Sequence, residues 1–204
     1  MRIAVMASGT GSNLQVLLDT VHGRDGITVA GVASDKPGAL ALERAAAAGV
    51  PTRVFPRADF ADRRARDAAI ADWLDELGVG LVVLAGYMAI LDGAFIARFA
   101  GRIVNVHPSL LPAFTGLHAV QQAVDYGVKV FGVTVHFVDE GVDTGPVILQ
   151  DSIVLENAVD ADAVLAALRP LEHRLLPEAV RLVAAGAVRA DAEVPRRMLI
   201  RRDP

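Results

Sequence analysis

The sequence has no cysteine among its 204 residues, which excludes disulfide bonds, a thiolate nucleophile and cysteine-ligated zinc. No apolar run reaches the ~18 residues that a membrane helix needs, so no membrane span is predicted. The formal net charge is −4, which argues against nucleic acid or an anionic membrane as a main partner. The stretch from Met1 to Leu14 carries one positive charge and is soon interrupted by glycines, which is typical of a first strand and not of a signal peptide. These absences together predict a cytoplasmic protein.

The composition is that of an ordinary globular protein, with 53% hydrophobic and 22% charged residues. A chain of this length can bury a substantial core, and no internal repeat, low-complexity segment or linker interrupts it. We therefore predict one domain over residues 1–204.

In the first part of the chain, short apolar runs alternate with segments of helical spacing. Strands are expected at 2–7, 27–33, 52–55 and 79–84, and helices at 14–21, 39–48 and 60–77. Such an alternation predicts an α/β fold, Rossmann-like and doubly wound, with a mostly parallel sheet.

The second part begins in the same way, with a helix at 91–99, a strand at 102–106 and a helix at 117–126. Two strands at 130–138 and 147–155 then follow without a helix between them, which predicts an antiparallel edge. The last helical zone, 160–185, is expected to break or bend at Pro170 and Pro177. The tail after Gly186 has some strand-like pattern.

A glycine-bearing turn, Gly9 to Asn13, joins the first strand to the first helix. Exposed N–H groups at a helix start attract an anion, and glycines allow a ligand to approach the backbone. Leu14 stands where a dinucleotide fingerprint has its third glycine, and no Walker lysine is present. A single phosphate therefore fits better than a pyrophosphate, and a plain tight turn capped by Ser12 or Asn13 is the alternative.

Two polar residues stand at the end of the 102–106 strand. Asn105 and His107 are two positions apart, so their side chains point to the same side of a strand. Asp143 lies in a loop between Gly141 and Gly145 that could bring a carboxylate back to that histidine. An amide and an imidazolium can stabilise an oxyanion, and a nearby carboxylate raises the pKa of an imidazole. We therefore predict acyl-transfer chemistry.

Two alternatives to this prediction use the same residue types. A metal site is one, but the sequence has no HExxH motif and no carboxylate cluster, so no metal is predicted. The other alternative is that the histidine at the strand end, His107, only makes structural hydrogen bonds. His136 is interpreted in that way, as a residue that faces solvent or a neighbouring strand.

At these residues the chain resembles the folate-dependent formyltransferases, and among them the phosphoribosylglycinamide formyltransferases of purine (IMP) biosynthesis. The matching stretches are Ser8–Leu14, Leu84–Met88 with Ile90–Leu91, Asn105–Pro112, Gly132–Val138 and Gly141–Pro146. The resemblance extends from near residue 1 to about Ala185. The stretches His107–Pro112 and Asp143–Pro146 are shared by formyltransferases generally, whereas Gly9–Leu14 is more specific to this group.

The resemblance implies the formyltransferase fold and the transfer of a formyl group from the co-substrate 10-formyltetrahydrofolate to the amine of glycinamide ribonucleotide. Asn105 and protonated His107 would stabilise the tetrahedral oxyanion, with His107 later protonating the leaving folate nitrogen. Asp143 would orient and charge His107 and relay the proton of the amine. The N-terminal half would bind the phosphate, and the C-terminal half would carry folate-binding and catalytic loops.

The resemblance also assigns binding residues. Gly11, Ser12 and Asn13 would hold the ribonucleotide phosphate, and Glu172 would lie near its ribose and amine. The folate-binding positions are Arg63, Met88, Ala89, Ile90 and Leu91, together with Asn105. Ala89 stands where many relatives have arginine, so that a side-chain contact is lost while backbone contacts remain. The Leu111–Pro112 bond can be cis, as in relatives.

Three other functions are weighed against this one. A formyltetrahydrofolate hydrolase uses the same three residues with water as acceptor, but such enzymes usually carry an extra N-terminal regulatory domain. A methionyl-tRNA formyltransferase would need a further C-terminal domain and a less negative chain. A binding module that has lost catalysis is disfavoured by intact Asn105, His107 and Asp143. Relatives include monomers and dimers, which leaves a homodimer open.

Overall fold

The computed structural model describes residues 1–201 of the chain, which fall into two compact units, Met1–Val104 and the residues from Asn105 onward. Seven strands form one sheet in the order β3-β2-β1-β4-β5-β6-β7, and two more form a separate small sheet. The predicted α/β fold, mostly parallel with an antiparallel edge, is confirmed. Within residues 1–201 no helix combines the length and the apolar character needed to cross a membrane.

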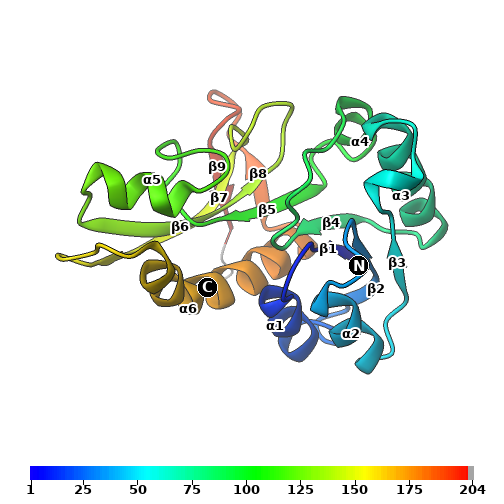
Figure 1. Ribbon diagram of the computed structural model, residues 1–204. Coiled ribbons are helices and arrows are strands. Elements are labelled where there is room, and N and C mark those ends of the chain that lie inside the picture. Colours follow the sequence, from blue (N-terminus) through cyan, green and yellow to red (C-terminus); the bar gives the residue numbers. More distant parts are fainter. Residues whose placement is uncertain (202–204) are drawn as a thin grey trace. The chain divides into compact units, whose positions relative to one another are not determined.

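The first unit contains four parallel strands whose order is β3-β2-β1-β4 (Figure 1). Its elements are β1 (Arg2–Met6), α1 (Ser12–Thr20), β2 (Thr28–Ser34), α2 (Leu40–Ala47), β3 (Thr52–Val54), the 3-10 turn η1 (Arg57–Asp59), α3 (Arg63–Glu76), β4 (Leu81–Leu84) and α4 (Gly93–Arg98). Helix α1 packs against α2, and α3 packs against α4. Side chains on both faces of β1 and β4 are buried, as expected for the central strands of a parallel sheet.

The order in which successive strands are added to the sheet reverses at β1, although the strands themselves stay parallel. Such a reversal is a common place for a ligand site. The chain steps outward from β1 to β2 and β3, and then returns to place β4 on the other side of β1. In open α/β sheets, ligands bind beyond the carboxyl ends of the strands at such a switch point. The loops that follow β1 and β4 meet there, since the Ser8 N–H donates to the Gly86 carbonyl over 3.0 Å.

The second unit is built on an antiparallel pair covered by a long helix. Its elements are β5 (Ile103–His107, which begins at the end of the first unit), α5 (Ala119–Tyr126), β6 (Val130–Phe137), β7 (Val147–Val154), α6 (Ala161–Ala184), β8 (Val188–Ala190) and β9 (Met198–Ile200). Strands β6 and β7 pair antiparallel, and α6 packs on both of them. The strand-like tail is a β8–β9 hairpin. The Leu111–Pro112 peptide bond is cis.

Helix α3 begins later than the sequence predicts, at Arg63 instead of Phe60. Asp62 caps it, because its side chain accepts a hydrogen bond from the Ala65 N–H over 2.7 Å. Phe60 is extended, and its ring stacks on the ring of Phe55 with the centroids 6.3 Å apart. An aromatic contact and a capping carboxylate therefore decide this boundary.

The expected break in the last helical zone is wrong, because α6 runs continuously through Pro170 and Pro177. A proline inside a helix costs about 3 kcal/mol through a lost hydrogen bond and a steric clash. Burial of a large apolar side chain contributes about 1.5–3 kcal/mol, and α6 buries several, including Leu168, Leu175 and Leu176. Packing on β6 and β7 offsets the intrinsic preference to break.

Candidate active site

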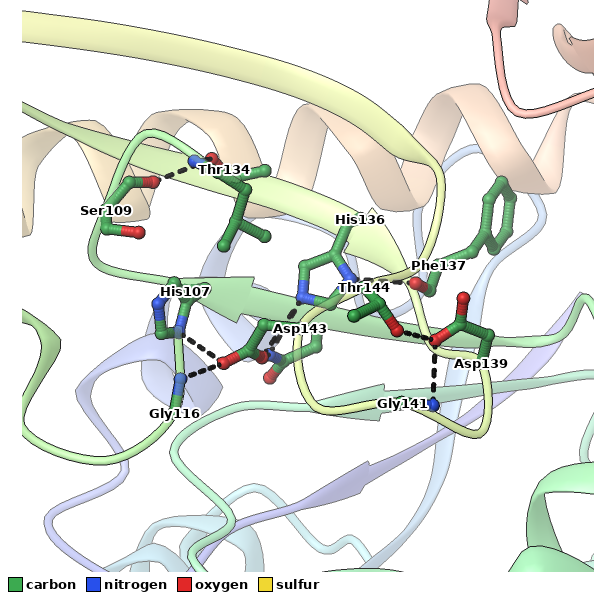
Figure 2. A network of polar contacts seen from close by, with 12 residues as sticks. His107, Ser109, Gly116, Thr134, His136, Phe137, Asp139, Gly141, Asp143 and Thr144 are labelled. Atoms are coloured by element: carbon green, nitrogen blue, oxygen red, sulfur yellow. Dashed lines mark hydrogen bonds and ion pairs between the residues drawn. The ribbon is translucent and has the colours of Figure 1, made fainter. Parts of the chain in front are cut away.

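Four polar side chains of the second unit meet at the end of β5. Asn105 is half-buried, whereas His107, the last residue of β5, is only 5% exposed. Asp143 lies between β6 and β7 and points back at His107, with 3.3 Å from its Oδ2 to the histidine Nδ1. The fourth side chain is His136 of β6, which is 1% exposed. Figure 2 shows the Asp143 carboxylate between the two histidine rings and the backbone of Gly116.

The loop that carries Asp143 is held in a tight turn. Asp139 accepts hydrogen bonds from the Gly141 N–H (3.1 Å) and from the Thr144 hydroxyl (2.5 Å). Gly145 passes so close to β6 that a Cβ there would lie 1.8 Å from the Phe137 carbonyl oxygen. Asp143 itself has a φ of 54°, in the region that few non-glycine residues adopt. Gly145 therefore lets this loop lie against β6, and Gly141 gives room for Thr144 inside the turn, so that the Asp143 carboxylate is aimed at His107.

His107 is placed between two groups that can only accept hydrogen bonds. Its Nε2 lies 2.8 Å from the Phe114 carbonyl oxygen, and its Nδ1 faces the Asp143 carboxylate. A neutral imidazole has one N–H and one lone pair, and a lone pair at Nδ1 would face a negative charge. Only the doubly protonated imidazolium matches both neighbours, so the geometry favours a cationic His107.

The same reasoning orients the side chain of Asn105. The Asn105 side chain lies 3.4 Å from Asp143 Oδ1, and a carboxylate needs a donor, so the atom that faces it is the amide nitrogen Nδ2. That nitrogen also lies 3.1 Å from His136 Nε2, which in turn lies 3.6 Å from Asp143 Oδ1. His136 Nδ1 then donates to the Phe137 carbonyl over 2.8 Å. His136 thus contacts both the Asn105 amide and the Asp143 carboxylate.

Asp143 is ionised because its surroundings favour the anion. Burial raises the pKa of Asp143, but the His136 ring, the Gly116 N–H at 2.7 Å and the charge of His107 outweigh burial and bring the pKa below its usual value. The cluster therefore combines a buried anion with a cation and two amide hydrogens. This combination suits the stabilisation of a negatively charged tetrahedral intermediate.

The remaining predicted residues lie outside this cluster. Gly11, with a φ of 71°, precedes α1, Ser12 opens the helix half-buried, and Asn13 is buried. No side-chain cap is present at this helix end, so the alternative of a turn capped by Ser12 or Asn13 is wrong. A Cβ on Gly11 would lie 2.7 Å from Ala41 Cα, so packing on α2 already requires a glycine there.

The predicted folate positions lie in the first unit, and Glu172 lies half-buried in α6 of the second. Arg63 is the first residue of α3 and is exposed. Met88 and Ile90 are 60% and 62% exposed in the segment after β4, while Leu91 is buried. Ala89 between them is half-buried.

Sequence reasoning did not assign His136 to the site. Of its two interpretations, solvent or a neighbouring strand, the second is correct, because His136 contacts Asn105 of β5. A signal for it was available, since Thr134 and His136 alternate with Val133 and Val135, and all four are buried. Polar residues at every second position of a fully buried strand must find partners, and here His136 finds Asn105. In the described part of the chain, residues 1–201, no three His, Asp or Glu side chains are grouped so that they could hold a metal ion.

Comparison with known protein families gives a match over residues 1–180 to the family described as formyl transferase. The chain belongs to the formyl transferase family. A phosphoribosylglycinamide formyltransferase of Haemophilus influenzae is 42% identical over 189 residues, which cover 92% of this chain and 89% of that protein.

Two further relatives extend the comparison of this formyl transferase. The trifunctional purine biosynthetic protein adenosine-3 of Bos taurus is 42% identical over 189 residues, but the chain spans only 19% of that protein's length. A crystal structure of glycinamide ribonucleotide transformylase 1 from Symbiobacterium toebii has a TM-score of 0.94 at 45% identity and covers 99% of this chain and 94% of its own. The relatives thus include both free-standing enzymes and a segment of a multifunctional one.

Proposed function

We propose that this protein transfers the formyl group of 10-formyltetrahydrofolate to the amine of glycinamide ribonucleotide, a step of purine biosynthesis. The observation that carries the proposal is the cluster at the end of β5, where the buried His107 ring faces the Asp143 carboxylate 3.3 Å away beside the Asn105 amide. Similarity to phosphoribosylglycinamide formyltransferases over nearly the whole chain supports the choice of substrates.

In the proposed reaction the amine nitrogen attacks the formyl carbon, and the carbonyl oxygen becomes an oxyanion. His107 and Asn105 donate hydrogen bonds to that oxyanion. The bond between the carbon and folate N10 then breaks as His107 gives a proton to N10, and the proton lost by the amine passes through water to Asp143 and back to His107. The products are tetrahydrofolate and the formylated ribonucleotide, and the residues return to their starting protonation states.

The donors of the cluster are all engaged before substrate binds. Both N–H groups of His107 face the Phe114 carbonyl and Asp143, and those of Asn105 face His136 and Asp143. The oxyanion would accept the His107 Nε2–H in place of the Phe114 carbonyl. It would also accept the Asn105 N–H that now faces Asp143 over 3.4 Å. His136 would keep its hydrogen bond and so hold the Asn105 amide in position.

The remaining assignments belong to the same proposal. Gly11, Ser12 and Asn13 would bind the phosphate with the N–H groups at the start of α1, and Glu172 would contact the ribose or amine. Arg63, Met88, Ala89, Ile90 and Leu91 would bind the folate, and no metal takes part. A homodimer and a cytoplasmic location stay predictions from the sequence.

The decisive experiment mixes the purified protein with 10-formyltetrahydrofolate and follows loss of the formyl group with and without glycinamide ribonucleotide. We expect turnover that requires the ribonucleotide and produces one formylated product per folate consumed. A His107→Asn variant serves as the control for background deformylation. Turnover with water alone would indicate the hydrolase, and no turnover with either acceptor would refute formyl transfer.

A further inference from the structure

The first unit contains a buried ion pair whose two residues have no part in the proposed reaction. Arg66 and Asp67 of α3 are 4% and 1% exposed, and 2.7 Å separate the guanidinium Nη2 from the carboxylate Oδ1. Burying two charges carries a desolvation penalty that their attraction barely offsets, so apolar residues would stabilise the same place equally well. The presence of a buried ion pair there therefore calls for a reason other than stability.

The remaining hydrogen bonds of the pair lead to the segment after β4. Arg66 Nη2 donates to the Ile90 carbonyl over 3.3 Å, and Asp67 Oδ2 accepts from the Asp92 N–H over 2.6 Å. Asp92 in turn caps α4 by accepting from the Ala94 N–H. The guanidinium of Arg66 thus binds the backbone just before Leu91, and the carboxylate of Asp67 binds it just after Leu91.

The other end of this segment is also fixed. The Ser8 hydroxyl accepts from the Met88 N–H over 2.9 Å and donates to Asp35 over 2.5 Å. The backbone of residues 88–92 is therefore held at three points by side chains from elsewhere in the first unit. The side chains of Met88 and Ile90 are left more than half exposed on this fixed backbone.

For a ligand, the segment after β4 offers only apolar side chains and the polar groups of its backbone. From Gly86 to Leu91 no side chain is charged, and Ala89 offers a single methyl group. A planar ring can pack on Met88 and Ile90, but its polar edge must bond to backbone N–H and C=O groups. Such bonds depend on backbone position to within about 0.5 Å.

We propose that Arg66 and Asp67 are positioning residues that set the backbone of residues 88–92, and that folate affinity depends on them. The inference rests on the proposed function, which places the folate on this segment. Neither residue has to touch the folate, since each acts through the backbone group that it binds.

The competing explanation is that the pair only joins α3 to α4. The structure supplies a matched control, because Arg98 of α4 also bridges to α3 through Asp72 (2.7 Å) and Asp75 (2.8 Å). These ion pairs are exposed, and both join α4 to α3 through residues outside 88–92. An Arg98→Met variant therefore weakens the same helix pair and leaves the folate segment alone.

The test compares wild type with Arg66→Lys, Asp67→Asn and Arg98→Met in steady-state formyl transfer. Lysine keeps the charge opposite Asp67 but loses the planar fork that also reaches Ile90. Asparagine keeps an oxygen for the Asp92 N–H but loses the negative charge that strengthens this bond and holds the Arg66 guanidinium. We expect both pair variants to raise KM for 10-formyltetrahydrofolate about tenfold, the effect of one lost hydrogen bond to a charged group. Their kcat and their KM for the ribonucleotide should stay within about threefold of wild type, and Arg98→Met should change none of the three.

Two results would overturn the inference while formyl transfer by wild type stands. The first is that the Arg66→Lys and Asp67→Asn variants both fold and both keep an unchanged KM for the folate. The other is an equal loss in kcat and in both KM values, or a loss that Arg98→Met reproduces, since the pair would then act on stability alone. If wild type shows no transfer, calorimetric titration with tetrahydrofolate decides separately. Tighter binding to wild type than to Arg66→Lys supports the inference, and no binding to wild type refutes it.

Discussion

Replacement of Asp143 by asparagine removes one charge from the centre of the cluster and little else. An asparagine at this position has the same shape, and its side-chain oxygen can still accept the Gly116 N–H at 2.7 Å. What it loses is the negative charge 3.3 Å from His107 Nδ1. We expect kcat to fall by about 10²–10⁴-fold, the range attributed to proton transfer by a positioned group, while the variant folds normally.

The size of this effect follows from the distance. Two unit charges 3.3 Å apart attract by about 5 kcal/mol at an effective dielectric constant of 20. The Asp143 side chain is only 12% exposed, so solvent screens this attraction weakly. Since about 1.4 kcal/mol corresponds to a tenfold change in rate, the lost attraction has a ceiling of roughly three to four powers of ten. The expected loss lies at or below that ceiling.

The same charge makes the stability of the wild type depend on pH. Because the pKa of Asp143 in the folded protein lies below the usual value of 3.8, the unfolded chain binds a proton first as the pH falls. The contribution of Asp143 is therefore complete above about pH 4 and is lost as the pH falls through the folded pKa. We expect the advantage in unfolding free energy of wild type over Asp143→Asn to shrink as the pH falls below about 4.

The assay is single-turnover formyl transfer with enzyme in excess, which separates the chemical step from product release. Asp139→Asn is the matched control, because Asp139 lies in the same loop and its oxygen accepts two hydrogen bonds that asparagine can retain. This control should keep its rate within about threefold. An Asp143→Asn enzyme that stays within tenfold of wild type from pH 6 to 9 would refute the role given to the aspartate.

Three further substitutions test other parts of the site. His136→Leu removes the partner of one Asn105 N–H. We expect urea unfolding to show a loss of about 1–3 kcal/mol of stability, and we expect a lower kcat. An unchanged kcat would show that His136 does not hold Asn105 in position. Gly145→Ala forces the Asp143 loop off β6, so we expect about 1–3 kcal/mol of destabilisation and at least a tenfold loss of kcat, and full activity would contradict the close approach. Ser12→Glu at the start of α1 should raise KM for the ribonucleotide at least tenfold with little change in kcat or in KM for the folate, and an unaltered KM would exclude phosphate binding there.

Local patterns in the sequence determined most of the secondary structure. Apolar periodicity, glycines and chain order were enough to predict the parallel strands and the antiparallel pair of β6 and β7. The spacing of two between Asn105 and His107 was enough to predict that they share a side of a strand. Each of these features depends on neighbours within a few residues, which the sequence displays directly.

Only the tertiary structure decided which distant groups pair. His107 and Asp143 are 36 positions apart, and their ion pair depends on a loop that Gly145 presses against β6. The contact of His136 with Asn105 and the fixed backbone of residues 88–92 depend on buried side chains that a periodic pattern cannot distinguish from core residues. The uninterrupted α6 likewise reflects packing energy that exceeds the preference of two prolines. Sequence determines which residue types are present and which face they occupy, whereas the partner of a buried polar group is set by the packing of segments far apart in the chain.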